Sequence, residues 1–131
     1  MTLSMIFIAY MIKIMDKKEI TMNRNWKFNK EIEATPCAPG IERKILAYTN
    51  ELMCVENHFK KGAVGALHHH PHTQITYVVS GQFEFEIDGV KKVVNPGDTM
   101  LKKDSIEHGC VCLEDGVLLD IFTPMREDFV N

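Results

Sequence analysis

Histidines form the densest group of chemically capable residues in this sequence. Four of the six fall within five consecutive positions: His68, His69, His70 and His72. Because side chains alternate along a strand, we expect His68 and His70 to point one way and His69 the other. Two imidazoles on one face can bind a divalent ion if neighbouring strands supply the remaining ligands. We expect His69 and His72 outside the ligand set, where either could orient a ligand.

Gln74 and His108 are the residues that we expect to complete this site. Gln74 opens the next strand-like segment, and His108 follows after enough chain for a hairpin to leave and return. Three imidazole nitrogens and one neutral oxygen leave the charge of the ion uncompensated, so the site should attract an anion. The sequence therefore predicts one divalent metal ion (Zn, Ni, Fe or Mn) on His68, His70, Gln74 and His108. The alternative is that the histidines are solvated surface groups or hydrogen-bonded core groups.

A carboxylate inside an apolar segment is the second chemical feature. Leu118, Asp120 and Phe122 share one face of the strand-like segment 117–122. Burying an unpaired carboxylate is costly, so Asp120 should have either a partner or a chemical role. A general acid–base role is one interpretation, and a structural acid bonded to a backbone amide or an arginine is the other. Cys110 and Cys112 are expected to be small buried hydrophobic residues rather than ligands.

The segments around these residues are short and rich in strand-forming residues. Strand-like runs cover 41–48, 52–59, 74–80, 83–87, 90–94, 111–113 and 117–122, and turn-forming residues separate them. Phe83, Phe85 and Ile87 alternate with acidic residues, and Asp88-Gly89 then predicts a tight hairpin. We also expect turns at 95–98 and 114–116. Many short strands between turns indicate an all-β sandwich or barrel.

Composition limits the classes of partner. The 131 residues are enough for one domain, and the net charge of −3 with interleaved signs disfavours nucleic acid. Four cysteines without a Cys-x-x-Cys pair indicate reduced thiols and a cytoplasmic location. Residues 1–15 are interpreted as an N-terminal extension, because Met15 resembles an ordinary start of a protein. Residues 16–131 are interpreted as a single domain. The apolar run 3–12 is too short to span a bilayer, so no membrane partner is expected; a weak surface anchor is the alternative.

The histidine region resembles a known pattern. Gly62, His68, His70, Gln74 and Gly81 have the spacing of the first cupin motif, with glutamine in the usual glutamate position. The segment 96–98 together with His108 resembles the second motif, although Lys103 replaces its usual proline and its terminal asparagine is absent. The resemblance implies a single-domain cupin fold, a double-stranded β-helix or jelly-roll barrel. The change from glutamate to glutamine weakens the case for an oxidative iron site.

Two longer segments resemble the KdgF-type pectin degradation proteins. These segments are 68–81 and 120–129, and the likeness extends over about 40–129. It implies an enzyme that converts 4,5-unsaturated monouronates from pectin or alginate into linear keto-uronates by ring opening and tautomerisation, without an organic cofactor. It also implies that Asp120, Phe122 and Arg126 are active-site residues beside the metal. From the residues alone, Phe122 would be core and Arg126 an ordinary surface arginine.

Three further expectations remain open at this stage. A mononuclear-iron cupin dioxygenase would need Fe(II) and oxygen uptake. A non-catalytic sugar-binding cupin module would bind without turnover. Small cupins commonly dimerise, so we expect a homodimer in which 41–59 supplies edge strands for pairing.

Overall fold

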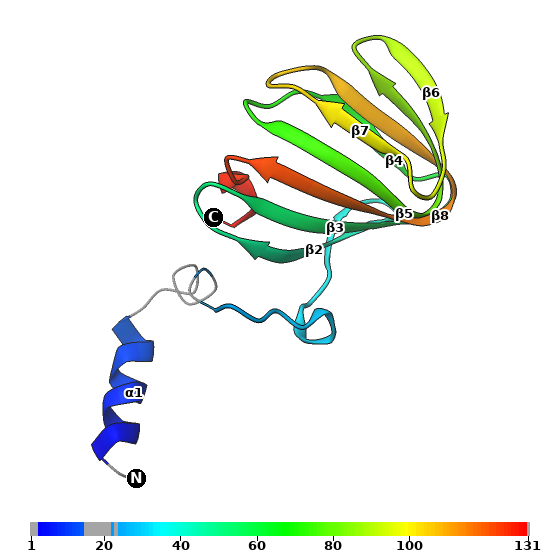
Figure 1. The fold of residues 1–131 in the computed structure, drawn as a ribbon. Coiled ribbons are helices and arrows are strands. Elements are labelled where there is room, and N and C mark those ends of the chain that lie inside the picture. The colour runs from blue at the N-terminus through cyan, green and yellow to red at the C-terminus, as the bar shows by residue number, and fades with distance from the viewer. Residues whose placement is uncertain (1–2, 15–21, 23, 131) are drawn as a thin grey trace.

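The protein is built almost entirely from antiparallel strands. The computed structural model describes residues 3–14, 22 and 24–130. Its elements, shown in Figure 1, are α1 (Leu3–Ile14), η1 (Asn29–Glu31), β1 (Thr35–Ala38), β2 (Ile41–Tyr48), β3 (Met53–Phe59), β4 (Val64–His68), β5 (Thr73–Ile87), β6 (Val90–Val94), β7 (Thr99–Lys102), β8 (His108–Thr123) and η2 (Glu127–Phe129).

One bent sheet forms the barrel. The strands lie in the order β1-β2-β3-β8-β5-β6, while β4 pairs with β8 and β7 pairs with β5, every pair being antiparallel. The long strands β5 and β8 cross both halves, so the sheet curls around a common interior (Figure 1). The predicted all-β barrel is therefore confirmed. β3 lies inside the sheet rather than at its edge, which leaves only part of β2 available for the edge pairing that we expected.

Two predicted breaks are wrong, because β5 and β8 continue through them. The turn residue Gly81 lies inside β5, and the predicted turn 114–116 lies inside β8. The pairing of the two strands shifts register between Val78 and Phe83, which bends them without interrupting them. Turn-forming residues here mark a bulged corner of the barrel rather than a reversal of the chain.

The corner depends on the backbones of Gly81 and Gly116 coming close together. A Cβ atom added at Gly81 would lie 2.5 Å from the Cα of Gly116 and 2.6 Å from the carbonyl oxygens of Glu114 and Asp115. Gly81 also has a φ of +80°, a conformation that other residues adopt at a cost. Both features require glycine, and they explain why turn-forming residues occur in the middle of these strands.

We expect Gly81→Ala to lower the free energy of unfolding by about 2–5 kcal/mol, the sum of a left-handed backbone and overpacking. Gly89→Ala is the matched control, because Gly89 has a similar φ of +78° but nothing within 4 Å of an added Cβ. Its cost should be only about 1–2 kcal/mol. Urea unfolding of both variants measures the difference, and equal costs would show that the close approach contributes nothing.

The predicted hairpin between β5 and β6 is confirmed. Asp88 and Gly89 both have positive φ, 50° and 78°, as this tight turn requires. Upstream in β5, Phe83 and Phe85 point into the barrel and are buried, as their alternation with glutamates predicts. The turn at 95–98 is also present, closed by the Asp98 N–H donating to the Asn95 carbonyl.

The apolar core is divided into two clusters. One surrounds Phe83 and Phe85 and includes Phe59, Val78 and Leu118. The other consists of buried side chains near the end of β8, namely Tyr48, Met53, Val55, Phe122 and Met125. Polar residues are also buried in the interior, and they form the site described below.

The N-terminal helix α1 lies apart from the barrel (Figure 1). Its 12 residues extend about 18 Å, well short of the hydrocarbon thickness of a bilayer. No helix among the described residues is long and apolar enough to cross a membrane. The predicted boundary between extension and domain, at 15/16, lies outside the described residues.

Candidate metal centre and active site

Three histidines converge at one end of the barrel. His68 ends β4 and is paired with His108, the first residue of β8. The ligand atoms of His68, His70 and His108 all lie within 4.8 Å of one another. His70 reaches this cluster from the loop after β4, so strand alternation was the wrong reason for a correct grouping. The loop is held by the His70 carbonyl, which accepts hydrogen bonds from the His72 and Ser105 N–H groups.

Backbone carbonyls set the tautomers of His68 and His108. The Nδ1 of His68 lies 2.7 Å from the Ala66 oxygen, and the Nδ1 of His108 lies 2.9 Å from the Ile106 oxygen. A carbonyl can only accept, so each Nδ1 carries the proton and each Nε2 keeps its lone pair. Both rings therefore present Nε2 as a potential metal ligand.

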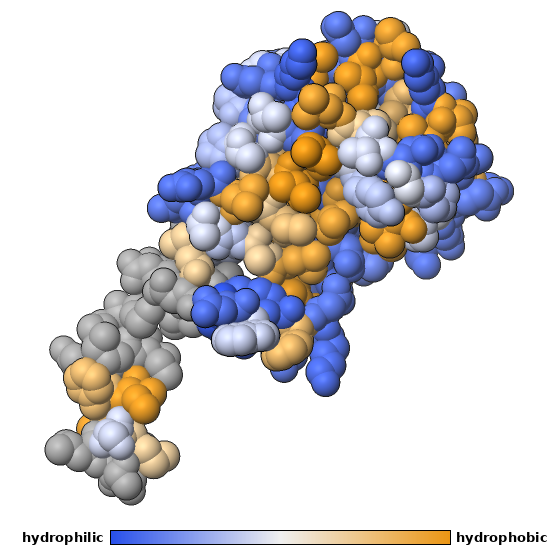
Figure 2. Space-filling model, in the orientation of Figure 1, coloured by the Kyte–Doolittle hydropathy of each residue, from blue (hydrophilic) through white to orange (hydrophobic). Residues whose placement is uncertain are grey.

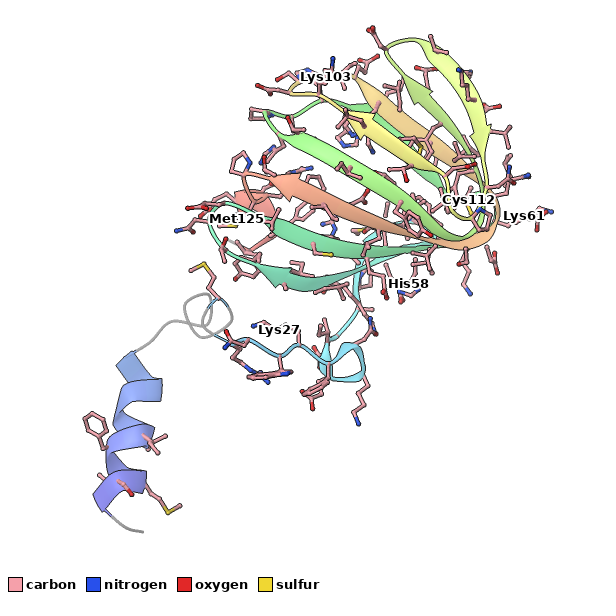
Figure 3. The ribbon with its side chains drawn as sticks, in the orientation of Figure 1. Lys27, His58, Lys61, Lys103, Cys112 and Met125 are labelled. Carbon is pink, nitrogen blue, oxygen red and sulfur yellow. The ribbon has the colours of Figure 1, made fainter. Side chains whose placement is uncertain are left out.

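His72 sets the tautomer of His70 through a relay. The Nε2 of His72 lies 3.1 Å from the Met125 carbonyl oxygen and must donate to it. The Nδ1 of His72 therefore accepts from the Nδ1 of His70 at 3.1 Å, which leaves the Nε2 of His70 with its lone pair. His72 thus orients a predicted ligand, which is the role that the sequence analysis suggested for it. Met125 lies where the chain leaves β8 (Figure 3).

Burial keeps two of these imidazoles neutral. Desolvation lowers the pKa of both His70 and His108 to about 4, helped by Arg126 near His70 and by Lys102 near His108. Neutral imidazole is the form that binds metals, so neither ring has to lose a proton at neutral pH.

The side-chain amide of Gln74 is buried and fixed in orientation. Its Nε2 donates to the Asp120 Oδ1 at 2.8 Å and to the Thr76 Oγ1 at 3.1 Å. An ionised carboxylate only accepts, so the amide orientation is fixed and Oε1 is left over. This Oε1 and the Nε2 atoms of His70 and His108 are buried without a hydrogen-bond partner. Orphaned acceptors of this kind are costly, and together with the His68 Nε2 they fit a divalent cation.

Asp120 is buried and held by neighbouring side chains. Its Oδ1 accepts from Gln74 and in a short hydrogen bond from Thr76, and its Oδ2 accepts from the Asn57 Nδ2 at 2.7 Å. These partners are neither the backbone amide nor the arginine that a purely structural acid was expected to have. Asp120 therefore orients the amide of a predicted ligand and also faces the interior beside it.

A cavity of about 460 Å³ joins these groups, a size suited to a small molecule. His68, Gln74, His108, Asp120, Phe122 and Arg126 all line it. The buried Phe122 ring packs against His70, with centroids 5.7 Å apart, and forms a wall of the cavity. Arg126 also lines it, and its guanidinium is bound at both Nε and Nη2 by the carboxylate of Asp128, at 3.0 and 2.8 Å.

Sequence analysis missed four charged or amide residues of the cavity, one of which is Asp128, the partner of Arg126. Arg43 and Lys102 line it, and so does Asn57. Lys102 is only 2% exposed, and its ammonium lies 5.0 Å from the Phe85 ring centroid. Desolvation lowers the pKa of Lys102, whereas Asp120 raises it. Alternation was the available signal, since Arg43 shares a strand face with the buried Ile41 and Lys102 with the buried Met100.

The remaining histidines and cysteines lie outside the candidate metal centre. His69 is exposed. The Nε2 of His58 lies 2.6 Å from the Oε1 of Glu56, and His58 does not belong to the histidine cluster. Cys110 and Cys112 are buried, as expected, and burial raises the pKa of Cys110 to about 12. Figure 3 shows Cys112 at the opposite end of the barrel from Met125.

Comparisons with known proteins agree with this architecture. A model of the Cupin domain family matches residues 55–122. The chain is 46% identical over 93 residues to the pectin degradation protein KdgF of Dickeya dadantii (strain 3937), an alignment that covers 70% of this chain and 84% of that protein.

Two solved structures are similar over most of the chain. An RmlC-like cupin from Shewanella frigidimarina NCIMB 400 is 40% identical, with a TM-score of 0.81 over 84% of this chain and 99% of that one. KdgF from Halomonas sp. is 42% identical, with a TM-score of 0.79 over 82% of this chain and 100% of that one.

Proposed function

As this chain belongs to the cupin family and is similar to pectin degradation proteins within it, we propose that it converts 4,5-unsaturated monouronates into linear keto-uronates. The observation that carries the proposal is the hydrogen bond between Gln74 and Asp120 inside one cavity. This bond joins a buried carboxylate to the amide of a predicted neutral ligand, which supports an acid–base residue beside a metal ion. A Lewis acid and an acid–base residue together suit proton transfer on an anionic sugar.

The reaction is an isomerisation and needs no external oxidant or reductant. In the substrate, the ring oxygen, C5 and C4 form an enol ether, and C1 carries a free hydroxyl. Ring opening breaks the bond between C1 and the ring oxygen and forms the C1 carbonyl. The resulting enol at C5 then becomes a ketone when C4 gains a proton. All atoms of the substrate remain in the product.

Residues of this chain account for each of these steps. Asp120 accepts the proton of the C1 hydroxyl and returns a proton at C4. Phe122 walls the cavity and excludes water, while Arg126 offers a planar guanidinium to the substrate carboxylate. A divalent ion held by His68, His70, Gln74 and His108 would polarise an oxygen of the substrate as a Lewis acid.

The charge of the cavity supports an anionic substrate. Arg43, Lys102 and Arg126 line it together with two carboxylates, the buried Asp120 and the exposed Asp128, so the cations outnumber the acids by one. The predicted ligands are all neutral, so a bound cation would increase the positive charge further. A sugar that carries a carboxylate matches this electrostatic environment better than a neutral sugar.

Cellular location and assembly are part of the same proposal. All four cysteines are free thiols, which supports a reducing compartment such as the cytoplasm. Exposed apolar side chains on the outer face of β5 and β7 support a homodimer: Ile75, Tyr77, Val79 and Leu101. Figure 2 shows apolar side chains gathered in a band across one face of the barrel.

Purified protein is expected to remove the ultraviolet absorbance of unsaturated galacturonate much faster than the spontaneous reaction does. The reason is that ring opening and tautomerisation destroy the double bond conjugated to the carboxylate. Absorbance and a carbonyl-reactive product would be followed in one preparation, with its metal content and oxygen consumption measured in parallel. Oxygen uptake would indicate a dioxygenase instead, and binding without turnover would indicate a sugar-binding module. A rate equal to the spontaneous one would overturn the proposal.

A further inference from the structure

Arg43 lines the cavity from the strand opposite the histidines. It lies on β2, and its guanidinium carbon is 3.6 Å from the centroid of the Phe129 ring. Stacking on an aromatic ring holds the planar group in one orientation. Arg43 is therefore a cation of fixed position within the cavity, although the resemblance to known proteins did not point to it.

The hydrogen-bonding capacity of Arg43 is not used up. Its Nε is buried without a hydrogen-bond partner, and no acid pairs with it in the part of the chain that the structure describes. Burying an unsatisfied donor costs free energy, and a carboxylate ligand would recover it. Arg126 differs, since Asp128 already binds two of its nitrogens. Arg43 is thus the better prepared of the two arginines to bind an incoming carboxylate.

A row of side chains connects Arg43 to the metal-binding residues. Gln74 on β5 donates to Asp120 on β8, and Asn57 on β3 donates to Asp120 from the other side. Arg43 on β2 is the cross-strand partner of Asn57. Asn57 is in turn paired with Leu118, two residues before Asp120, so Arg43 stands two strands, roughly 10 Å, from the backbone of Leu118. Asp120 shares the inward face of β8 with Leu118 and raises the pKa of Arg43.

We infer that Arg43 binds the carboxylate of the substrate and makes the enzyme specific for acidic sugars, with Arg126 as the second cation. The inference rests on the proposed function and adds a residue to it. Arg43 would hold the carboxylate at the side of the cavity lined by Phe129, while the reacting carbons lie toward Asp120. Burial lowers the pKa of Arg43 and so does Arg126, whereas Cys37, Asp128 and Asp120 raise it, so the carboxylate would join a site that already holds charges of both signs.

Steady-state kinetics on unsaturated galacturonate provide the first test. Arg43→Gln should raise KM about 10- to 100-fold through the loss of charged hydrogen bonds, with kcat changed only a few-fold. Arg43→Lys keeps the charge but loses the planar fork, so its KM should be intermediate. Lys44→Gln is the matched control, since Lys44 is the next residue on β2 and donates to Asn29 outside the cavity. Its KM should equal that of the wild type.

Calorimetric binding of saturated galacturonate and of galactose provides the second test, and it does not depend on turnover. The wild type should bind galacturonate at least about tenfold more tightly than galactose, and Arg43→Gln should remove this preference. Metal content and thermal midpoint are measured for each variant. A purely structural role would lower the thermal midpoint of Arg43→Lys and Arg43→Gln alike without removing the preference for the acidic sugar.

The two tests separate the inference from the proposed function. If the wild type does not turn over the unsaturated sugar, the proposed function fails, and the galacturonate preference still decides the role of Arg43. If turnover is present but Arg43→Gln keeps the wild-type KM and preference, only the inference on Arg43 is overturned. A wild type that binds neither sugar, or both equally, also overturns it.

Discussion

Replacing Asp120 with asparagine is expected to lower kcat by about 10²- to 10⁴-fold while the protein keeps its fold and its metal. The asparagine oxygen can still accept from Gln74 and Thr76, which preserves the orientation of the predicted ligand. Its amide group can donate to the Oδ1 of Asn57 once the Asn57 amide turns over, since this Oδ1 is buried and unpartnered and the Asn57 Nδ2 faces the site in the wild type. The variant therefore loses the proton acceptor and little else. Turnover and metal content are measured on the same sample.

Thr76→Val is the matched control for Asp120. Thr76 donates to the same Oδ1 and accepts from the Gln74 amide, so the valine variant removes two hydrogen bonds and leaves the carboxylate in place. We expect a loss in kcat within about tenfold. Asp120 would instead be a positioning residue if Asp120→Asn lost its metal and recovered activity when metal was added back. A kcat within tenfold of the wild type would exclude the acid–base role.

His108→Ala should weaken metal binding by more than about 100-fold, because even the outer partners of metal ligands contribute 10- to 100-fold. Turnover should fall to the spontaneous rate unless excess metal is supplied. The reason is that His108 provides one of three ligand atoms within 4.8 Å of one another. Elemental analysis after dialysis, together with the absorbance assay, measures both effects.

His69→Ala is the control for this variant. His69 lies in the same histidine-rich segment but is exposed, so its removal should leave metal content and turnover unchanged. Equal metal loss in the two variants would mean that the segment binds metal nonspecifically, as a run of surface histidines does. Unchanged metal content in His108→Ala would contradict the predicted ligand set.

Local patterns were sufficient to predict much of the fold and several residues of the cavity. The hairpin at Asp88-Gly89 follows from two adjacent residues that tolerate positive φ, and the structure has it. The inward position of Asp120 follows from its alternation with apolar neighbours. Strand alternation grouped His68 with His70, a returning hairpin added His108, and the ligand atoms of all three do meet. The roles assigned to Gln74 and Asp120 stay predictions.

Other features depend on contacts between distant segments, which local patterns do not contain. The tautomer of His70 is set through His72 by a backbone carbonyl at Met125, 53 residues away from His72. β5 continues through Gly81 because the backbones of Gly81 and Gly116 can come close together. A turn-forming residue is therefore part of a continuous strand here. Arg43 looks like an exposed charge on a strand until Phe129 is folded against it.

β8 carries a predicted ligand at its first residue and the proposed acid–base residue near its last. Inserting or deleting one residue between them would turn Asp120 and Phe122 to the outside of the barrel while His108 stayed inside. Evolution can therefore lengthen the hairpin at Gly89 and the turn at Gly97, but it can alter the length of β8 only in pairs of residues. Engineers who graft a new specificity onto this scaffold face the same restriction.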